Sequence, residues 1–425
     1  MPVSSRVVGD GSGPPSAGTG PASGSAVLTN LGERAGTRPM HRAGETVVRR
    51  YTQPATLAAD LPLWDASALG GRGTTPMQTR PWVVACAETF AQDAALNVIT
   101  IEDASGIAAV APMIRRPSFP PVSELLGVRE LSEPSDLVFR DAQALAAIIH
   151  ELARDTAPIL LERVPARSAS VAAIRAGVRR KAVVISRPGN TCPYITLEGV
   201  DKSPDQIISG RLRSDLRRAQ RKAESRGKVT YEIHAPRTAA EFLPLFEQAV
   251  QVEAAGWKGR GGSAVAVNQM PRAFFTRYGE LASEEGILRL AFLRIDGAVT
   301  AMQYAVQWNG AFWLLKIGYD ESFSKCSPGM LLIQHTLRYA AEQGLHSYEF
   351  LGSAESWTRR WTTAEMSTLR TMIYPFGPAG MVTLGRDVLR SVRRKLAVRL
   401  AARRQASEAP EDADTVSSSA GAEGE

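Results

Sequence analysis

Apolar and polar positions follow strand and helix periods in two long stretches of the chain. In the first stretch, periodicity predicts helices over 77–90, 141–155 and 167–177 and strands over 97–102, 106–113, 157–162 and 181–186. In the second, it predicts helices over 204–226, 239–254, 271–284 and after residue 329, and strands over 229–234, 287–295, 298–307, 311–319, 346–351 and 367–374. Asp296-Gly297 and Asn309-Gly310 are strong hairpin turns. The pattern therefore predicts an α/β (α+β) fold with two similar modules in tandem, each a mixed sheet flanked by helices.

Composition sets the limits of these modules. Residues 1–45 are rich in Gly, Ser, Pro, Thr and Ala, and residues 405–425 are acidic and small, so both ends are predicted to be disordered tails. The N-terminal module is expected over 46–200 and the C-terminal module over 201–380. A basic amphipathic helix is predicted at 386–404. It either packs on the core by a narrow apolar stripe or lies on an anionic membrane.

The most informative functional pattern begins where the strand at 311–319 gives way to an apolar-periodic helix. Ser327-Pro328-Gly329 opens that helix. A helix N-terminus offers unpaired N–H groups and the positive end of the helix dipole, and a glycine has no Cβ to keep a phosphate away. The segment lacks the Lys-Ser/Thr ending of a P-loop and the glycine spacing of a dinucleotide fold. We therefore predict an anion cradle that is not one of the usual nucleotide loops.

Several further motifs surround this loop in a fixed order. They are Glu253-Ala-Ala-Gly256-Trp257-Lys258-Gly259, Leu315-Lys316-Ile317-Gly318-Tyr319-Asp320-Glu321, Ser327-Pro328-Gly329-Met330-Leu331-Leu332, Phe350-Leu351-Gly352, Glu355, Trp357, Arg359 and Trp361. In order and spacing the chain resembles the CelD-like acetyltransferases, GNAT-fold acyltransferases often labelled cellulose-biosynthesis proteins and distantly related to the FemAB peptidyltransferases. The resemblance covers residues 50–375 and is most specific in the second half. One departure is Tyr348-Glu349-Phe350, where the family usually has an Asp-containing strand end.

The resemblance implies tandem GNAT-like modules, with the coenzyme site in the second. In GNAT folds the strand before the phosphate loop separates from its neighbour, and the pantetheine arm of acyl-coenzyme A pairs with the exposed strand edge. The residues implied to bind the coenzyme are Ile317, Gly318, Tyr319, Ser327, Pro328, Gly329 and Met330. The implied co-substrate is acetyl-CoA or another acyl-CoA, and no metal is expected.

Three carboxylates are candidates for the general base of acyl transfer. Glu253 precedes the Gly256 turn, Asp320 ends the strand before the phosphate loop, and Glu349 ends the next strand. A thioester meets an amine or hydroxyl directly, so the reaction needs little more than a proton acceptor and an oxyanion donor. A salt bridge at the end of an element would explain each carboxylate equally well. Glu253 and Asp320 are the favoured bases.

Candidate acceptor-binding residues lie near the same motifs. Lys316 lies in an otherwise apolar strand, where a lysine is normally paired or faces a cavity, so it either pairs with Asp320 or binds an acceptor anion. The other candidates are Trp257, Lys258, Glu355, Trp357 and, in the basic segment 211–228, Arg213 and Arg217. Tryptophans more often pack in a core, and a charge run is usually a solvated helix face.

Charge and cysteine content narrow the functional classes. The 425-residue chain carries a net charge of +7, which favours an anionic partner such as a coenzyme, an activated or lipid-linked sugar, or membrane lipid. No helix-turn-helix or zinc pattern accompanies the charge, so specific nucleic-acid binding is not expected. Three widely spaced cysteines and the lack of a signal peptide or a long apolar run predict a cytoplasmic protein, peripheral at the inner face of the membrane if the basic helix binds lipid.

These patterns together predict an enzyme that moves an acetyl or acyl group from acyl-CoA to an amine or hydroxyl acceptor in polysaccharide or cell-envelope biosynthesis. One alternative is a FemAB-type aminoacyl or peptidyl transferase that uses charged tRNA. Another is a non-catalytic scaffold that associates with the membrane through the 386–404 helix.

Overall fold

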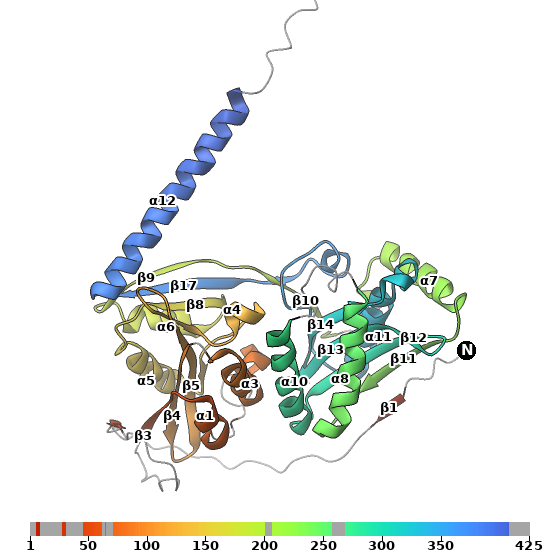
Figure 1. Cartoon of the computed structure of the whole chain (residues 1–425), viewed down its shortest axis with the longest axis horizontal. Coiled ribbons are helices and arrows are strands. Elements are labelled where there is room, and N and C mark those ends of the chain that lie inside the picture. The colour runs from red at the N-terminus through yellow and green to blue at the C-terminus, as the bar shows by residue number, and fades with distance from the viewer. Residues whose placement is uncertain are drawn as a thin grey trace, which may run out of the picture.

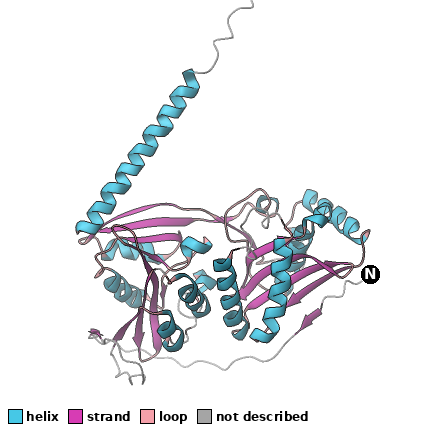
Figure 2. Ribbon diagram, in the orientation of Figure 1, coloured by secondary structure: helices cyan, strands magenta, loops and turns pink. Residues whose placement is uncertain are grey.

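Two twisted β-sheets, each flanked by helices, lie side by side in the protein (Figures 1 and 2). The computed structural model describes residues 6–8, 28–30, 46–61, 64, 71–92, 94–199, 206–256 and 268–407. The mixed α/β fold with two similar modules is thereby confirmed. Most of the predicted leader and the end of the predicted acidic tail lie outside the described residues.

The C-terminal sheet has eight strands in the order β1-β11-β12-β13-β14-β15-β10-β16. The strands are β1 (Arg6–Val8), β10 (Cys192–Thr196), β11 (Val229–His234), β12 (Leu288–Ile295), β13 (Ala298–Trp308), β14 (Ala311–Tyr319), β15 (Ser347–Glu349) and β16 (Glu365–Met366). Helices α8 (Ala239–Ala254) and α10 (Gln269–Glu284) cover one face. Helices α7 (Gly210–Glu224) and α11 (Pro328–Glu342) cover the other.

The N-terminal sheet has nine strands, with the main order β2-β3-β4-β5-β6-β8-β17-β9 and β7 paired with β5. The strands are β2 (Leu28–Asn30), β3 (Thr46–Tyr51), β4 (Ala95–Asp103), β5 (Gly106–Arg116), β6 (Val122–Leu125), β7 (Val138–Phe139), β8 (Ile159–Pro165), β9 (Ala182–Pro188) and β17 (Thr368–Pro375). Helices α1 (Pro54–Asp60) and α3 (Arg80–Phe90) pack on one face. Helices α5 (Ala142–Leu152) and α6 (Ala169–Gly177) pack on the other, and α4 (Val128–Leu131) follows β6.

Local sequence explains the best predicted elements. Strands β11 and β14 and helix α8 have the bounds that periodicity predicts. Thr238 begins α8 because its side chain accepts a hydrogen bond from the Glu241 N–H. Asp296 and Asn309 both adopt positive φ (51° and 49°), the conformation that two-residue hairpin turns require. The three strands of the meander are therefore fixed by short-range signals.

The two modules share one hydrophobic core, which lies between α3 of the first and α10 of the second. The Trp82 ring packs edge-on against Phe274 and Tyr278, with ring centroids 4.9 and 5.0 Å away. An ion pair between Glu88 and Arg277 (2.6 Å) lies across the same helix pair. The modules are thus joined by packing as well as by the chain.

The modules also exchange strands. Strand β10, which precedes residue 200, pairs with β15 and β16 in the C-terminal sheet. Strand β17, from the end of the second stretch, lies between β8 and β9 in the N-terminal sheet and runs along the top of the molecule (Figure 1). The boundary expected near residue 200 therefore does not coincide with the division between the sheets.

The C-terminal helix α12 (Pro378–Ser407) is longer than the 386–404 prediction. Its first turns contact β17, and the rest projects away from both modules (Figure 1). Among the described residues, no helix combines the length and the apolar character needed to cross a bilayer. Between β15 and β16 the chain forms a 3-10 turn, η5 (Thr358–Arg360).

Candidate acyl-transfer site

Strands β14 and β15 separate after a short parallel pairing. Register pairs join Ala311–Trp313 of β14 to Ser347–Glu349 of β15 and end there. Strand β14 continues to Tyr319, still paired with β13 on its other side. We call Leu314–Tyr319 the diverging segment. Separation of two neighbouring strands at this point is the feature that the resemblance implied for the pantetheine arm.

A β-bulge in β14 sets which side chains of the diverging segment face which layer. Tyr304 pairs with Lys316 and Ala305 with Leu314, so Leu315 is the additional residue. Leu315 packs in the core shared with α8 and α10, whereas Ile317 packs in the core under α11. Because the bulge reverses the alternation, Lys316 lies on the α8/α10 side as well. The Lys316 Nζ lies 5.0 Å from the centre of the Phe275 ring on α10.

The loop after β14 contains the residues of the predicted anion cradle. The Asp320 side chain accepts a hydrogen bond from the Ser322 N–H and so begins the 3-10 helix η4 (Glu321–Cys326). Ser327 then adopts a left-handed conformation (φ 47°), and its side chain makes no capping bond to α11. Pro328 has no N–H, and the Met330 N–H is directed at the Ser327 carbonyl. Within the described chain, the Gly329 N–H makes no hydrogen bond.

Space at Gly329 fits a bound anion. A Cβ added there would lie 3.6 Å from Tyr319 Cδ1, which is ordinary van der Waals contact with a residue of the diverging segment. The end of α7 brings cations to the same loop, because Arg226 lies 4.6 Å over the Phe323 ring and the Cys326 thiol donates to the Lys222 carbonyl (3.7 Å). Met330 packs beside this core. The first turn of α11 thus follows a loop that Arg226 contacts, and its Gly329 N–H makes no hydrogen bond within the described chain, two features that favour an anion.

Glu253 lies against the diverging segment on the α8/α10 side. A Cβ on Gly318 would lie 3.0 Å from the Glu253 Cα, so only glycine lets the helix and the strand approach this closely. The Glu253 side chain is almost fully buried, with 1% of its surface exposed. Trp257 and Lys258, predicted from the same motif, lie outside the described residues.

Glu349 is the last residue of β15 in register with β14. It is buried and accepts a hydrogen bond from the Ser347 hydroxyl (2.7 Å). Burial raises its pKa to about 7 because the charged form loses hydration. The neighbouring Tyr348 points to the other face, where its hydroxyl bonds that of Thr336 on α11 (3.0 Å). Glu349 therefore lies on the same side of the sheet as Lys316 and Glu253.

A cluster from both modules, which the sequence did not reveal, lies where the chain leaves β15. The Gly352 N–H donates to Glu133 Oε2 (3.4 Å), from the loop after α4. The Arg163 guanidinium on β8 donates to the Gly352 carbonyl and to the Cys192 sulfur (3.1 Å) on β10. Burial raises the pKa of Cys192 to about 11, so this thiol is not an activated nucleophile. Sequence patterns could not reveal this cluster, because its residues come from four segments that are far apart in the chain.

A second, polar cleft lies beyond α7. Its volume is about 950 Å³, and it is lined by the start of α7, by β10 and by residues 359–364. The cations in its wall are Arg211, Arg359 and Arg360, and Arg360 pairs with Asp215 (2.8 Å). Arg213 and Arg217 are exposed on α7 but do not line this cleft.

The predicted pair Glu355 and Trp357 shapes the loop beside that cleft. The Trp357 indole N–H donates to Glu355 Oε2 (2.9 Å), and the Trp357 ring packs edge-on against Phe350. Both residues thus stabilise the loop that leads from β15 to η5.

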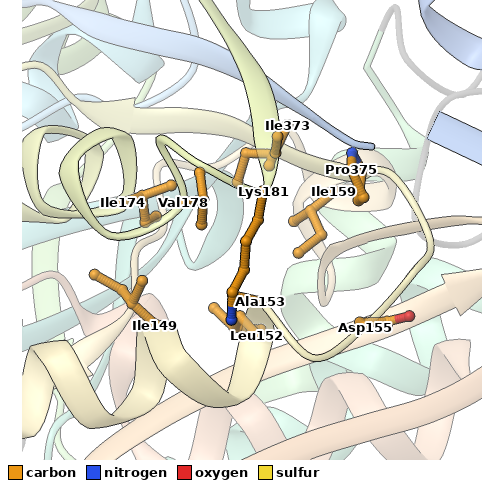
Figure 3. A pocket seen from close by; sticks show the side chains of 11 residues that line it. Ile149, Leu152, Ala153, Asp155, Ile159, Ile174, Val178, Lys181, Ile373 and Pro375 are labelled. Carbon is orange, nitrogen blue, oxygen red and sulfur yellow. The ribbon is translucent and has the colours of Figure 1, made fainter. Parts of the chain in front are cut away.

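The N-terminal sheet has a much smaller cavity. It measures about 20 Å³ and lies between α5, α6 and the strand ends, among Ile149, Ile174, Val178 and Lys181 (Figure 3). A space of this size holds about one water molecule. It is far too small for a coenzyme. Among the described residues, no cluster of His, Cys, Asp or Glu is arranged to hold a metal ion.

Comparison with known proteins agrees with this geometry. Residues 210–359, from α7 to η5, match the acetyltransferase (GNAT) domain family. No curated protein sequence matches the chain. Similar solved structures include FemX (13% identity, covering 71% of this chain and 92% of that one, TM-score 0.48). They also include the C-terminal domain of a putative lysylphosphatidylglycerol synthetase from Agrobacterium fabrum (11%, 72% and 91%, 0.45) and a tandem GNAT protein from the clavulanic acid biosynthesis pathway (13%, 79% and 99%, 0.43).

The family match includes the diverging segment, the phosphate loop and α11. The C-terminal module therefore contains a GNAT acetyltransferase domain, and the protein is an acyltransferase enzyme. The class of chemistry predicted from the sequence is confirmed.

Proposed function

We propose that the enzyme transfers an acetyl or longer acyl group from acyl-coenzyme A to an amine or hydroxyl acceptor. The observation that carries the proposal is the diverging segment, which is followed through η4 by the first turn of α11, a helix start without a side-chain cap. Pantetheine amides would pair along Ile317, Gly318 and Tyr319. The pyrophosphate would bind at Ser327–Met330, near Lys222 and Arg226.

The acceptor would approach from the α8/α10 side of β14. Lys316, Glu253 and Glu349 lie on that side, and the bulge at Leu315 turns the backbone of β14 beside them. A thioester carbonyl between the strands would then meet the acceptor without crossing the sheet.

Two finer assignments belong to the same proposal. The CelD-like resemblance favours a role in polysaccharide or cell-envelope biosynthesis, and the basic surface of α7 favours an acceptor that carries phosphate. The alternative, an aminoacyl transferase that uses charged tRNA, is supported by the basic α7 alone.

Isothermal calorimetry tests the donor. Acetyl-CoA should bind with a stoichiometry near one, and the bound ligand should raise the melting temperature by mass action. Desulfo- or free coenzyme A serves as the control for the acyl group. Failure of acetyl-CoA and of longer acyl-CoA to bind, together with tight binding of aminoacyl-tRNA, would replace the proposal by its alternative.

We further propose that the outer part of α12 binds an anionic membrane surface. Its apolar stripe is about half exposed and consists of Leu389, Val392, Leu396 and Leu400. The cations around this stripe are Arg386, Arg390, Arg393, Arg394, Lys395 and Arg399. An exposed apolar stripe flanked by cations fits the interface of a lipid bilayer with negative headgroups.

Co-sedimentation with vesicles tests the membrane proposal. The protein should bind phosphatidylglycerol vesicles, less at high salt, and should not bind neutral phosphatidylcholine vesicles. A deletion after Arg390 keeps the hydrogen bond between Tyr374 and Asp387 (2.9 Å), so it should abolish binding without lowering the melting temperature. Unchanged sedimentation of the truncated protein would exclude α12 as the membrane contact.

A further inference from the structure

Unusual backbone conformations gather at the junction of the two modules. Among the described residues, six that are not glycine have a positive φ. Two lie in hairpin turns and Ser327 opens α11. Of the remaining three, Ser132 (56°) is the C-cap of α4 and Arg163 (59°) lies at the bulge of β8 against β17, whereas Leu351 (58°), directly before Gly352, has no such local explanation. Each lies within one residue of a group in the cluster of Glu133, Arg163 and Gly352. Conformations of this kind persist only where the surroundings impose them, and they concentrate at functional sites.

This junction lies across the gap between β14 and β15. The last register pair joins Trp313 to Glu349. Lys316 is three residues beyond Trp313 on β14, and Gly352 is three residues beyond Glu349 in the segment that follows β15. The Gly352 N–H donates to Glu133, and the charge of Lys316 acts on the same carboxylate, so Glu133 lies near Lys316 at this gap. The bulge at Leu315 is at this gap too.

Charges from several elements act on Glu133. Arg163 from β8 and Lys316 from β14 favour its ionised form, while Cys192 from β10 and Glu349 from β15 are the other titratable groups around the junction. Loss of hydration outweighs the two cations and raises the pKa of Glu133 to about 7. A carboxylate in this range is half ionised near neutral pH, the state in which proton acceptance and release are both efficient.

We infer that Glu133, contributed by the N-terminal module, is the proton acceptor for the acyl acceptor, so that the acceptor site is shared by both modules. This inference rests on the proposed acyl transfer. When an amine attacks, the N–C bond to the thioester carbonyl forms and the C–S bond breaks. An ammonium acceptor loses two protons overall. One ends on the coenzyme A thiol and the other reaches solvent through Glu133.

Accessibility separates Glu133 from the three carboxylates that the sequence offered as candidates, of which Glu253 and Asp320 were favoured. Glu253 is 1% exposed behind Gly318, and Glu349 is 9% exposed within β15. The Asp320 carboxylate is committed to the start of η4. Glu133 keeps part of its surface exposed and uses Oε2 for Gly352, so Oε1 is the oxygen that would take the proton.

Glu133→Gln tests the inference, with acetyl-CoA as donor and methylamine as the probe acceptor. Turnover, followed as release of the coenzyme A thiol, should fall by roughly 10²–10⁴-fold, while calorimetric affinity for acetyl-CoA stays unchanged. The rise of wild-type turnover with pH, centred near 7, should disappear in the variant. Hydroxylamine is already neutral at this pH, so it should react with the variant almost as fast as with the wild type. Glu133→Asp should recover part of the loss.

Asp136→Asn is the matched control. Asp136 is a buried acid of the same loop, bonded to the Ser168 hydroxyl and the Leu137 N–H, and burial raises its pKa to about 6. This variant should keep the turnover and the pH profile of the wild type.

The outcomes separate the inference from the function on which it rests. A wild type that binds no acyl-CoA contradicts the proposed function. Intact acetyl-CoA binding with equal turnover and equal pH profiles in the wild type and Glu133→Gln overturns the role of Glu133 alone. So does a wild type that binds acetyl-CoA but gives no thiol release with methylamine.

Discussion

The two modules contain the same central feature, a pair of neighbouring parallel strands, but only one of them opens. In the N-terminal sheet β6 pairs with β8 over Ser123 and Glu124 and ends at Leu125. In the C-terminal sheet β14 continues as the diverging segment after its last pair with β15. The chain after β6 instead turns at Gly127, which packs against Cys86, and returns as β7 to pair with β5. In the N-terminal module the chain after β6 thus returns to the sheet, whereas in the C-terminal module the diverging segment is the proposed place of a ligand.

The helices after these strands differ in the same way. In α5 the side chain of Asp141 accepts the Ala144 N–H (2.8 Å), so a carboxylate of the protein already occupies the anion position at the helix start. In α11 the side chain of Ser327 makes no such bond. Duplication of an architecture therefore does not duplicate its binding site. The N-terminal module serves instead as a support that delivers β8, β10 and Glu133 to the site of its neighbour.

The largest predicted effect concerns this supporting role. Trp82→Ala removes a large side chain, 2% exposed, from the core between α3 and α10, so the free energy of unfolding should fall by about 3–5 kcal/mol. Because the modules share this core and exchange β10 and β17, denaturant unfolding should remain a single transition. Trp357→Ala, on the outer loop, should cost much less. Two separate transitions, only one of them shifted by Trp82→Ala, would show that the modules are independent.

The next effect contrasts the two helix starts. Gly329→Glu places a carboxylate where the pyrophosphate of acyl-CoA would bind, and it should weaken acetyl-CoA binding at least about 100-fold by calorimetry. The fold should persist, because the added Cβ meets only Tyr319 and an acidic residue suits a helix N-terminus. Gln143→Glu makes the same change at the equivalent position of α5 and should leave the affinity unaltered. Equal affinities in all three proteins would remove the donor site from α11.

The register of each parallel strand pair also ends at a buried glutamate, Glu349 in the C-terminal sheet and Glu124 in the N-terminal sheet. Replacing each glutamate by neutral glutamine should change the free energy of unfolding in opposite directions. Glu349 has no Lys or Arg within ion-pair distance in the described chain, whereas Glu124 pairs with Arg116 and Arg129. The raised pKa of Glu349, about 7, means that the folded state holds a proton that the unfolded state releases from about pH 4.5 upward. Stability is therefore lost as pH rises toward 7.

Glu349→Gln should recover roughly 2 kcal/mol of unfolding free energy at pH 8, and little near pH 4.5. Glu124→Gln should lower stability at pH 8, since Arg129 loses its carboxylate and Arg116 keeps only Glu130. Urea denaturation at both pH values checks the pair. A destabilised Glu349→Gln at pH 8 would mean that the carboxylate is charged and compensated in the folded protein.

Short-range signals in the sequence made the elements of the proposed acyl-CoA site predictable. The proposed acceptor site depends instead on pairing between strands that are far apart in the chain. The bounds of α8, β11 and β14 followed from periodicity, a capping threonine and hairpin dipeptides. Ser327-Pro328-Gly329 marked the start of α11 for the same reason. Strand β10 is short and contains Pro193, so no period marks it, and the exchange of β17 is decided by pairing partners far away in the chain. Glu133 follows Ser132 in a loop whose left-handed backbone no residue type announces.

The smallest effect tests whether a helix start without a cap is sufficient for binding. Asp141→Ala removes the cap of α5 and should cost about 1 kcal/mol of stability at neutral pH. The hydrogen bond from the Ala144 N–H lowers the pKa of Asp141, so its contribution is present above the ordinary Asp range and is lost as pH falls through the lowered value. The difference in stability between variant and wild type should therefore shrink in acid, and Asp141→Ser should restore most of the lost stability.

Acetyl-CoA should still bind at one site, because α5 has neither a strand that diverges before it nor a glycine at its second position. A second bound acetyl-CoA in Asp141→Ala, measured as a stoichiometry of two, would show that the cap alone had kept the N-terminal module closed.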